Sequence, residues 1–430
     1  MGVGDAGPSR GNGRSVRGGA APEWDVIVAG AGPGGSTAAT LLAEAGVRVL
    51  VLEREHFPRF HVGESLLPAA ELLVTVLGIE PDPNVFLFKA GAQFVCEATG
   101  RQQTFDFNDA LAGPQRYAWH VDRARFDTLL RDRALEAGAE IRHGVRVDDV
   151  GFEPERVRVS SGDHEETARF FIDATGLDRF LARRMDAVRP YERFGKAAVF
   201  THFLGLGDGA RREFAPGNDI RIIVIPDGWL WAIPLTGDRL SVGLVSRKPG
   251  LRRERLDEYI DGSALFGRVL PGAERAATHM IGNYSFSNAA ASGPRYACVG
   301  DAACFIDPVF SSGVSLAVRR ALLTVERLIP ALAAGSEAEP DLMGPVGEVM
   351  QRGYDTFAAL VDRFYNTRFV DNLIFGAPAE ATHRAGVISV LAGDVFRDGN
   401  AFQDMLLQSR RQPPRAAERA PSGSVIARGR

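Results

Sequence analysis

The sequence predicts an α/β protein with a dinucleotide-binding βαβ domain, an inserted domain built on a mixed or antiparallel β-sheet, and a helical C-terminal region. Three observations predict this fold class. Near the N-terminus a glycine-rich turn joins an apolar run to an Ala- and Leu-rich helical pattern. The segments 198–206, 219–235 and 239–246 alternate as antiparallel strands do. Residues from about 340 to 410 follow a helical pattern.

The first ordered element is a βαβ unit. We expect a strand over residues 25–29, a helix over 36–44 that Gly46 ends, and a second strand over 47–52. Both strands are continuous apolar runs, which is typical of strands buried on both faces of a sheet.

The turn after the first strand carries Gly30, Gly32 and Gly35 in the order G-x-G-x-x-G, and Glu53 stands at the end of the second strand. In this context the glycines let the backbone approach a pyrophosphate at the helix N-terminus, and Glu53 can accept a hydrogen bond from a ribose hydroxyl. The pattern therefore predicts a dinucleotide site. A plain tight turn between strand and helix is the alternative.

Later segments continue the same domain. Residues 120–144 are expected to form a helix and a short strand, 168–176 a strand that ends in a glycine turn, and 296–329 a strand, a turn and a long amphipathic helix. The predicted division is 23–90, 117–185 and 290–335 for the discontinuous dinucleotide-binding domain, 91–116 and 186–289 for the sheet domain, and 336–412 for the helical region. Residues 1–22 and 413–430 are predicted to be disordered tails.

Composition excludes several classes of protein. With 430 residues, 45% hydrophobic and 24% charged, the chain resembles an ordinary globular protein, and its net charge of −4 gives no reason to expect nucleic acid or an anionic membrane as a partner. We find no apolar run that could span a bilayer and no signal peptide. Cys96, Cys298 and Cys304 lack metal-ligand spacing and are too few for a disulfide framework, so no metal and a cytoplasmic location are expected.

Together these pieces resemble the FAD-dependent monooxygenase superfold that aromatic hydroxylases, geranylgeranyl-type reductases and flavin-dependent halogenases share. The landmarks are the glycine turn with Glu53, "DATG" at 173–176 and "GDAACFIDP" at 300–308. The resemblance implies a GR2-type, Rossmann-like domain that binds FAD. It implies that Asp301 holds the ribityl chain and that Arg123 lies near the ribityl–pyrophosphate side. The other cofactor-binding residues that it implies are Gly34, Arg54, Ser65 and Pro308.

The segment "GWLWAIP", residues 228–234, matches the WxWxIP signature of flavin-dependent halogenases. Because residues two apart on a strand point to the same face, Trp229 and Trp231 can form a wall between the flavin and a substrate. Two ordinary core aromatics in a sheet are the alternative.

Lysine is rare in this chain. Among 50 Lys and Arg residues the lysines are Lys89, Lys196 and Lys248. Lys89 lies between Phe86, Phe88 and Phe94, where burial is expected, and a buried lysine can become a neutral amine whereas arginine cannot lose its proton. Its segment "FKAGAQF" resembles the one that carries the essential lysine of the halogenases. The alternative is a surface lysine whose stem lies on an apolar strand.

The segment "DPVFSSGVSLA", residues 307–317, resembles the turn at which halogenases bind chloride. The resemblance implies that the N–H groups of Ser312 and Gly313 bind the halide, favoured by the positive helix end, and that Ser311 belongs to the catalytic set. An ordinary Ser N-cap followed by Gly is the alternative. Tryptophan halogenases carry a glutamate where this chain has Phe310, so the resemblance is to the phenol and pyrrole branch. Segments 61–68 and 391–396 point to the same branch.

The resemblance implies a two-component, FADH2-dependent chlorinase of a phenol or pyrrole, free or tethered to a carrier protein. Reduced FAD and O2 would give a flavin hydroperoxide, chloride would convert it to hypochlorous acid, and Lys89 would steer that acid to the ring. No second G-x-G-x-x-G is placed for NADPH, which predicts a separate flavin reductase. The alternatives are an aromatic hydroxylase, a reductase of prenyl chains, and a catalytically silent FAD-binding protein.

Overall fold

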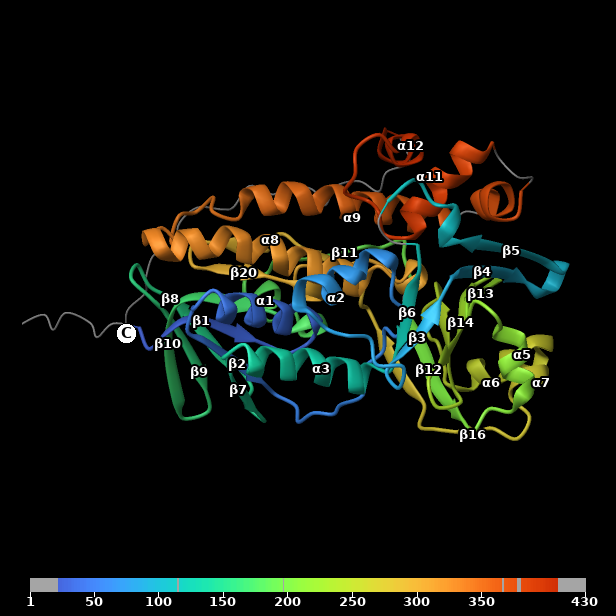
Figure 1. Ribbon diagram of the computed structural model, residues 1–430, viewed down its shortest axis with the longest axis horizontal. Helices are drawn as coiled ribbons and strands as arrows, with labels where there is room; N and C mark the ends of the chain where they lie inside the picture. Colours follow the sequence, from blue (N-terminus) through green and yellow to red (C-terminus); the bar gives the residue numbers. More distant parts are fainter. Residues whose placement is uncertain (1–21, 114–115, 196, 366, 377–379, 409–430) are drawn as a thin grey trace, which may run out of the picture.

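The computed structural model describes residues 22–113, 116–195, 197–365, 367–376 and 380–408. The predicted disordered tails therefore lie outside the described residues, apart from Pro22. The molecule is elongated, with a parallel sheet and its helices at one end, an antiparallel sheet at the other, and the C-terminal helices along the side (Figure 1).

The first sheet has the order β19-β20-β10-β1-β2-β7. Its parallel core consists of β1 (Trp24–Ala29), β2 (Val49–Glu53), β7 (Glu140–His143), β10 (His164–Asp173) and β20 (Tyr296–Cys298). Helices α1 (Pro33–Glu44), α3 (Arg123–Glu136) and α8 (Gly313–Ala334) pack beside one another along this sheet (Figure 1). The parallel strands end at one edge, so the glycine turn, the "DATG" segment and the "GDAACFIDP" segment meet there.

The βαβ unit forms as predicted, and the largest shifts are at the starts of the helix and of the second strand. Helix α1 begins at Pro33 rather than at 36, because proline is compatible with the first turn of a helix. Strand β2 begins at Val49 rather than at 47, because the amide of Val47 still donates to the oxygen of Leu42 at the helix end. Gly46, with φ +79°, makes the turn that ends the helix.

The second sheet has the order β16-β12-β15-β14-β13-β4-β5 and is antiparallel except between β13 and β4. Its main strands are β4 (Gly91–Cys96), β5 (Arg101–Asp106), β12 (Ala197–Leu204), β13 (Ile220–Ile225), β14 (Gly228–Leu235) and β15 (Arg239–Ser246). One face packs on α5 (Asp208–Phe214), α6 (Glu254–Gly262) and α7 (Ala264–Val269). The other face, which carries Trp229 and Trp231, belongs to the main core.

The C-terminal region is helical, as predicted. It consists of α9 (Gly344–Phe364), α10 (Thr367–Phe369), the π-helical segment η7 (Val370–Ile374), α11 (Ala381–Leu391) and α12 (Ala401–Gln408). Strands β3 (Phe86–Lys89) and β6 (Ala118–Val121) form a separate antiparallel pair.

The remaining elements are short. They are η1 (Pro68–Glu71), α2 (Leu72–Leu77), η2 (Glu97–Thr99), η3 (Phe107–Asp109), β8 (Asp149–Phe152), β9 (Val157–Ser161), η4 (Gly176–Asp178), α4 (Phe180–Arg184), β11 (Val188–Pro190), β16 (Glu274–Arg275), β17 (His279–Gly282), β18 (Phe286–Asn288), β19 (Ser292–Gly293), η5 (Gly300–Ala302), β21 (Cys304–Phe305) and η6 (Pro308–Phe310).

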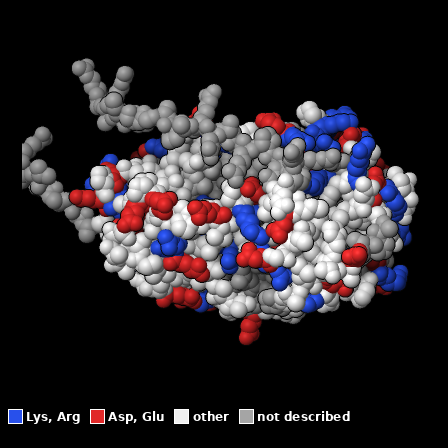
Figure 2. Space-filling model, turned by 90° about the horizontal axis from the view of Figure 1, so that it is seen from above, with Lys and Arg blue, Asp and Glu red and all other residues white. Residues whose placement is uncertain are grey.

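The surface carries charges of both signs. On the face drawn in Figure 2, acidic and basic side chains are interspersed, which agrees with the small net charge of −4. In the part of the chain that the structure describes, no helix has the length and apolar composition needed to cross a membrane.

Candidate functional site

A cavity of about 730 Å³ runs from the carboxyl ends of β1, β2 and β10 to the sheet that contains β14. Its lining includes every predicted site residue except Lys89. These are Gly30, Gly32, Gly34, Gly35, Glu53, Arg54, Ser65, Arg123, Trp229, Trp231, Asp301, Pro308, Ser311, Ser312 and Gly313.

The three glycines of the turn have different roles. A Cβ on Gly30, which has φ +102°, would lie 2.4 Å from the oxygen of Ala174, and one on Gly35 would lie 2.0 Å from the oxygen of Gly30. These two glycines allow close packing of strand, turn and helix. A Cβ on Gly32 would have its nearest neighbour at 3.7 Å, a side-chain nitrogen of Arg59. Gly32 therefore faces the cavity and leaves room for a ligand to approach the backbone.

Glu53 is buried at the end of β2 and braces the turn. Its Oε2 accepts from the amide of Ala31 at 2.7 Å and its Oε1 accepts from the amide of Glu55 at 2.9 Å. Since each carboxylate oxygen can accept a second hydrogen bond, Glu53 can still receive a ribose hydroxyl. Arg54 lies at the same end, half-exposed, and pairs with Asp178.

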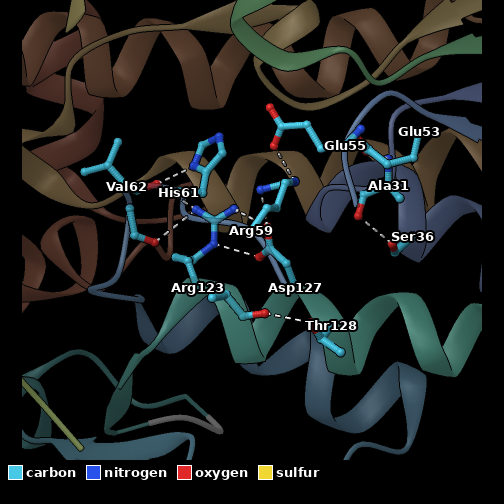
Figure 3. Close-up of polar contacts among 12 residues, drawn as sticks. Ala31, Ser36, Glu53, Glu55, Arg59, His61, Val62, Arg123, Asp127 and Thr128 are labelled. Atoms are coloured by element: carbon cyan, nitrogen blue, oxygen red, sulfur yellow. Dashed lines mark hydrogen bonds and ion pairs between the residues drawn. The ribbon is translucent and has the colours of Figure 1, made fainter. Parts of the chain in front are cut away.

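An arginine that the sequence analysis did not single out lies opposite the glycine turn. Arg59 is mostly buried, and its Nη1 is 3.2 Å from Oδ2 of Asp127. Asp127 also binds Arg123, which donates from Nε at 2.7 Å and from Nη2 at 3.0 Å, while Nη1 of Arg123 donates to the oxygen of Val62 at 2.8 Å (Figure 3). One buried carboxylate thus holds two guanidinium groups at the cavity wall. In the sequence, the spacing of four residues on a predicted helix could have indicated the pairing of Arg123 with Asp127.

Asp301 follows β20 on η5 and lines the cavity beside these arginines. Burial raises its pKa to about 6, although the charge of Arg123 acts in the opposite direction. The carboxyl group can therefore either donate or accept a hydrogen bond near neutral pH. This place and chemistry fit the polar ribityl chain that the resemblance assigns to it.

Trp229 and Trp231 lie on the same face of β14, and their ring centroids are 5.7 Å apart. The indole nitrogen of Trp231 donates to Oγ of Ser241 at 3.0 Å. Opposite it on β15, a Cβ on Gly243 would lie 2.2 Å from the Trp231 ring, so only glycine leaves space for the indole. The two rings form part of the cavity wall.

The predicted halide turn lies where η6 joins α8. Ser311 has φ +55°, an unfavourable region for a residue other than glycine, and Gly313 is the first residue of α8. Ser312 occupies the N-cap position but its side chain makes no capping hydrogen bond, so this is not an ordinary serine cap. Phe310 does not line the cavity, and its ring packs on Phe364, with ring centroids 5.7 Å apart.

Lys89 is buried, with 1% exposure, which excludes the surface-lysine interpretation. Its Nζ donates to Oγ of Ser65 at 2.9 Å and to the oxygen of Leu66 at 2.8 Å, and lies 5.2 Å from the ring centroid of Phe107. Burial lowers the pKa of Lys89 to about 7, against the opposing charge of Asp219. Lys89 stands behind Ser65 rather than on the cavity wall.

A second polar pair lies beside Ser65. Glu64 is buried and lines the cavity, and its Oε1 is 2.5 Å from Nε2 of His202 on β12. Burial lowers the pKa of His202, but the hydrogen bond and charge of Glu64 outweigh it and the pKa is raised. His202 comes from a distant strand, so no local pattern could reveal this pair.

The chain is similar in sequence and in fold to several halogenases. The family model described as tryptophan halogenase matches residues 25–114 and 95–377. The chain is 28% identical over 408 residues to the 1H-pyrrole-2-carbonyl-(peptidyl-carrier protein) chlorinase of Pseudomonas fluorescens, which covers 87% of this chain and 90% of that protein. It is 29% identical to the tryptophan 2-halogenase of Chondromyces crocatus, over 86% and 73% of the two chains. The myxobacterial chondrochloren halogenase CndH, a solved structure, shares 32% identity with a TM-score of 0.68, over 89% and 92% of the two chains.

Proposed function

The chain is an enzyme of the tryptophan halogenase family, and we propose that it uses FADH2, O2 and chloride to chlorinate an electron-rich aromatic ring in natural-product biosynthesis. The observation that carries this proposal is the position of Lys89. Its buried amine is one hydrogen bond from Ser65, on the wall of a cavity that begins at a dinucleotide turn and ends at Trp229 and Trp231.

The residues at the glycine end fit FAD. Gly32 leaves the backbone accessible to a pyrophosphate, Arg59 and Arg123 supply positive charge, and Glu53 retains acceptor capacity for a ribose. At the other end, Ser312 and Gly313 begin a helix of 22 residues, where amides without helical acceptors favour an anion such as chloride. When bound, reduced FAD together with O2 supplies the oxidation of chloride to hypochlorous acid.

Lys89 then acts on this acid. With a pKa of about 7, a large share of the amine is neutral at neutral pH and can accept a hydrogen bond from the hydroxyl of Ser65, which lines the cavity. Ser65 holds Nζ in place and connects it to the cavity. The ring then exchanges a C–H bond for a C–Cl bond, and the hypochlorous oxygen leaves as water. Trp229 and Trp231 keep the substrate from reaching the flavin directly.

The substrate class follows from Phe310. An apolar side chain there cannot assist attack on a less reactive ring, which favours a phenol or pyrrole. A relative acts on a pyrrole carried by a peptidyl-carrier protein, so both a free and a tethered ring belong to the proposal. The proposal also includes a separate flavin reductase as the source of FADH2, and a cytoplasmic location.

One assay tests this function. The protein is incubated with FAD, NADH, a flavin reductase, O2, chloride and a panel of phenols and pyrroles, and products are analysed by mass spectrometry for the chlorine isotope pattern. Chlorinated product that requires both the reductase and chloride is expected. Oxygenated product without a chloride requirement would instead identify an aromatic hydroxylase, and bound flavin without any product would refute the catalytic assignment.

A further inference from the structure

We propose that Tyr365, at the end of α9, is a positioning residue for the halide turn and acts through the carboxylate of Asp307. The inference rests on the proposed function, because it concerns the chloride amides of the same site. It connects the C-terminal helical region to the turn that begins α8.

Asp307 joins three parts of the chain that are far apart in sequence. Its Oδ1 accepts from the amide of Val309 at 3.1 Å and so caps η6, the turn that leads into the halide amides. Its Oδ2 accepts from the hydroxyl of Tyr365 at 2.8 Å and from the amide of Gly195 at 3.1 Å. Asp307 is 3% exposed, so these contacts are shielded from water.

The turn needs this support because its backbone is unfavourable. Ser311 has φ +55°, a conformation that persists only where the surroundings hold it. Asp307 fixes the start of η6, three residues before Ser311, and its own position depends on its donors. Burial raises the pKa of Asp307 to about 6, whereas Tyr365 and the two amides favour the ionised carboxylate.

Tyr365 is itself held firmly. The guanidinium group of Arg247 lies 5.0 Å from the centroid of its ring, and Nη1 of Arg247 donates to its backbone oxygen at 2.9 Å. On the other side of the carboxylate there is no spare volume. A Cβ on Gly195 would lie 2.7 Å from Oδ2 of Asp307 and 2.8 Å from the hydroxyl of Tyr284. Either a lost donor or an added methyl group therefore displaces the carboxylate.

The test compares three variants of the full chain with the wild type. Tyr365→Phe removes one donor from Asp307, and Gly195→Ala pushes on the same oxygen from another segment. Tyr354→Phe is the matched control, because Tyr354 is a buried tyrosine of the same helix that does not line the cavity. The readouts are the chloride KM, kcat at saturating chloride, the FAD Kd, and the halide-induced change in the absorbance of bound oxidised FAD.

For Tyr365→Phe and Gly195→Ala we expect the chloride KM and the spectroscopic halide midpoint to rise about tenfold, which is the effect of losing one hydrogen bond to a charged group. The FAD Kd and kcat at saturating chloride should stay within about threefold, and Tyr354→Phe should match the wild type. If both test variants keep the wild-type halide midpoint, the inference is wrong although the halogenase assignment stands. A wild type with neither chlorination nor a halide-dependent spectrum would overturn the assignment as well.

Discussion

Replacing Lys89 tests the chemistry of the site most directly. Lys89→Arg keeps a positive charge and much of the length, but a guanidinium group cannot supply a neutral amine. We expect Lys89→Arg and Lys89→Ala to bind FAD and to consume O2, yet to form essentially no chlorinated product. The exposed Lys248, which pairs with Asp227 at 2.7 Å, provides the matched control Lys248→Arg, which should retain full activity.

The structure also sets the size of the pH effect. With a pKa of about 7, Lys89 is about one tenth neutral at pH 6 and about nine tenths neutral at pH 8. If the neutral amine reacts, single-turnover chlorination should become about tenfold faster over that range. The FAD and the oxidant must be supplied in excess, so that the step at Lys89 limits the rate.

Stability gives a measurement that does not depend on activity. In the folded protein the pKa of Lys89 is about 7, below the ordinary value of 10.5. Between pH 7 and pH 10.5 the unfolded chain therefore binds more protons than the folded chain, and the free energy of unfolding rises with pH in this range. Below pH 7 the burial costs up to about 5 kcal/mol. Lys89→Met should therefore have a higher Tm than the wild type at pH 7, and this difference should shrink as the pH approaches 10.

Two results would contradict this reasoning. Chlorination by Lys89→Arg above about one tenth of the wild-type rate, a loss of less than about 1.4 kcal/mol, would show that a neutral amine is not required. If the Tm of Lys89→Met is lower than that of the wild type by the same amount at every pH, the burial of a charged Lys89 does not destabilise the fold.

Other substitutions have opposite or separable effects. Gly32→Ala should fold normally but raise the FAD Kd, because the added Cβ enters only the cavity. Gly35→Ala should lower the Tm, because the added Cβ lies 2.0 Å from the backbone oxygen of Gly30. Equal effects of the two variants on the Tm would argue against these roles. Arg59→Leu should weaken FAD binding by about tenfold in a fluorescence titration, through loss of a charge-assisted contact, and unchanged affinity would remove Arg59 from the site. Gly243→Ala should displace the indole of Trp231, which lies 2.2 Å from the added carbon, and an unchanged tryptophan fluorescence spectrum would contradict this.

The sequence determined those features that depend on neighbouring residues. The βαβ unit follows from two apolar runs around a helical pattern, and the shared face of Trp229 and Trp231 follows from the two-residue period of a strand. The turn that we propose for the halide lies at a helix start that local residues indicate. The burial of Lys89 was also predicted from its neighbours, although one of them, Phe88, proved to be 42% exposed, whereas Phe86 on the same face of β3 is 4% exposed.

Packing between distant elements brings the paired side chains of the site together. Lys89 and Ser65 are 24 residues apart, Glu64 and His202 are 138 apart, and Asp307 and Tyr365 are 58 apart, and each pair forms where separate elements pack. Arg59 lies outside any helix or strand, so no periodicity marks it as part of the site. The periodicity of a sequence predicts which face of a helix or strand a residue occupies. Contacts between distant elements depend on how those faces pack, and that packing is a property of the whole chain.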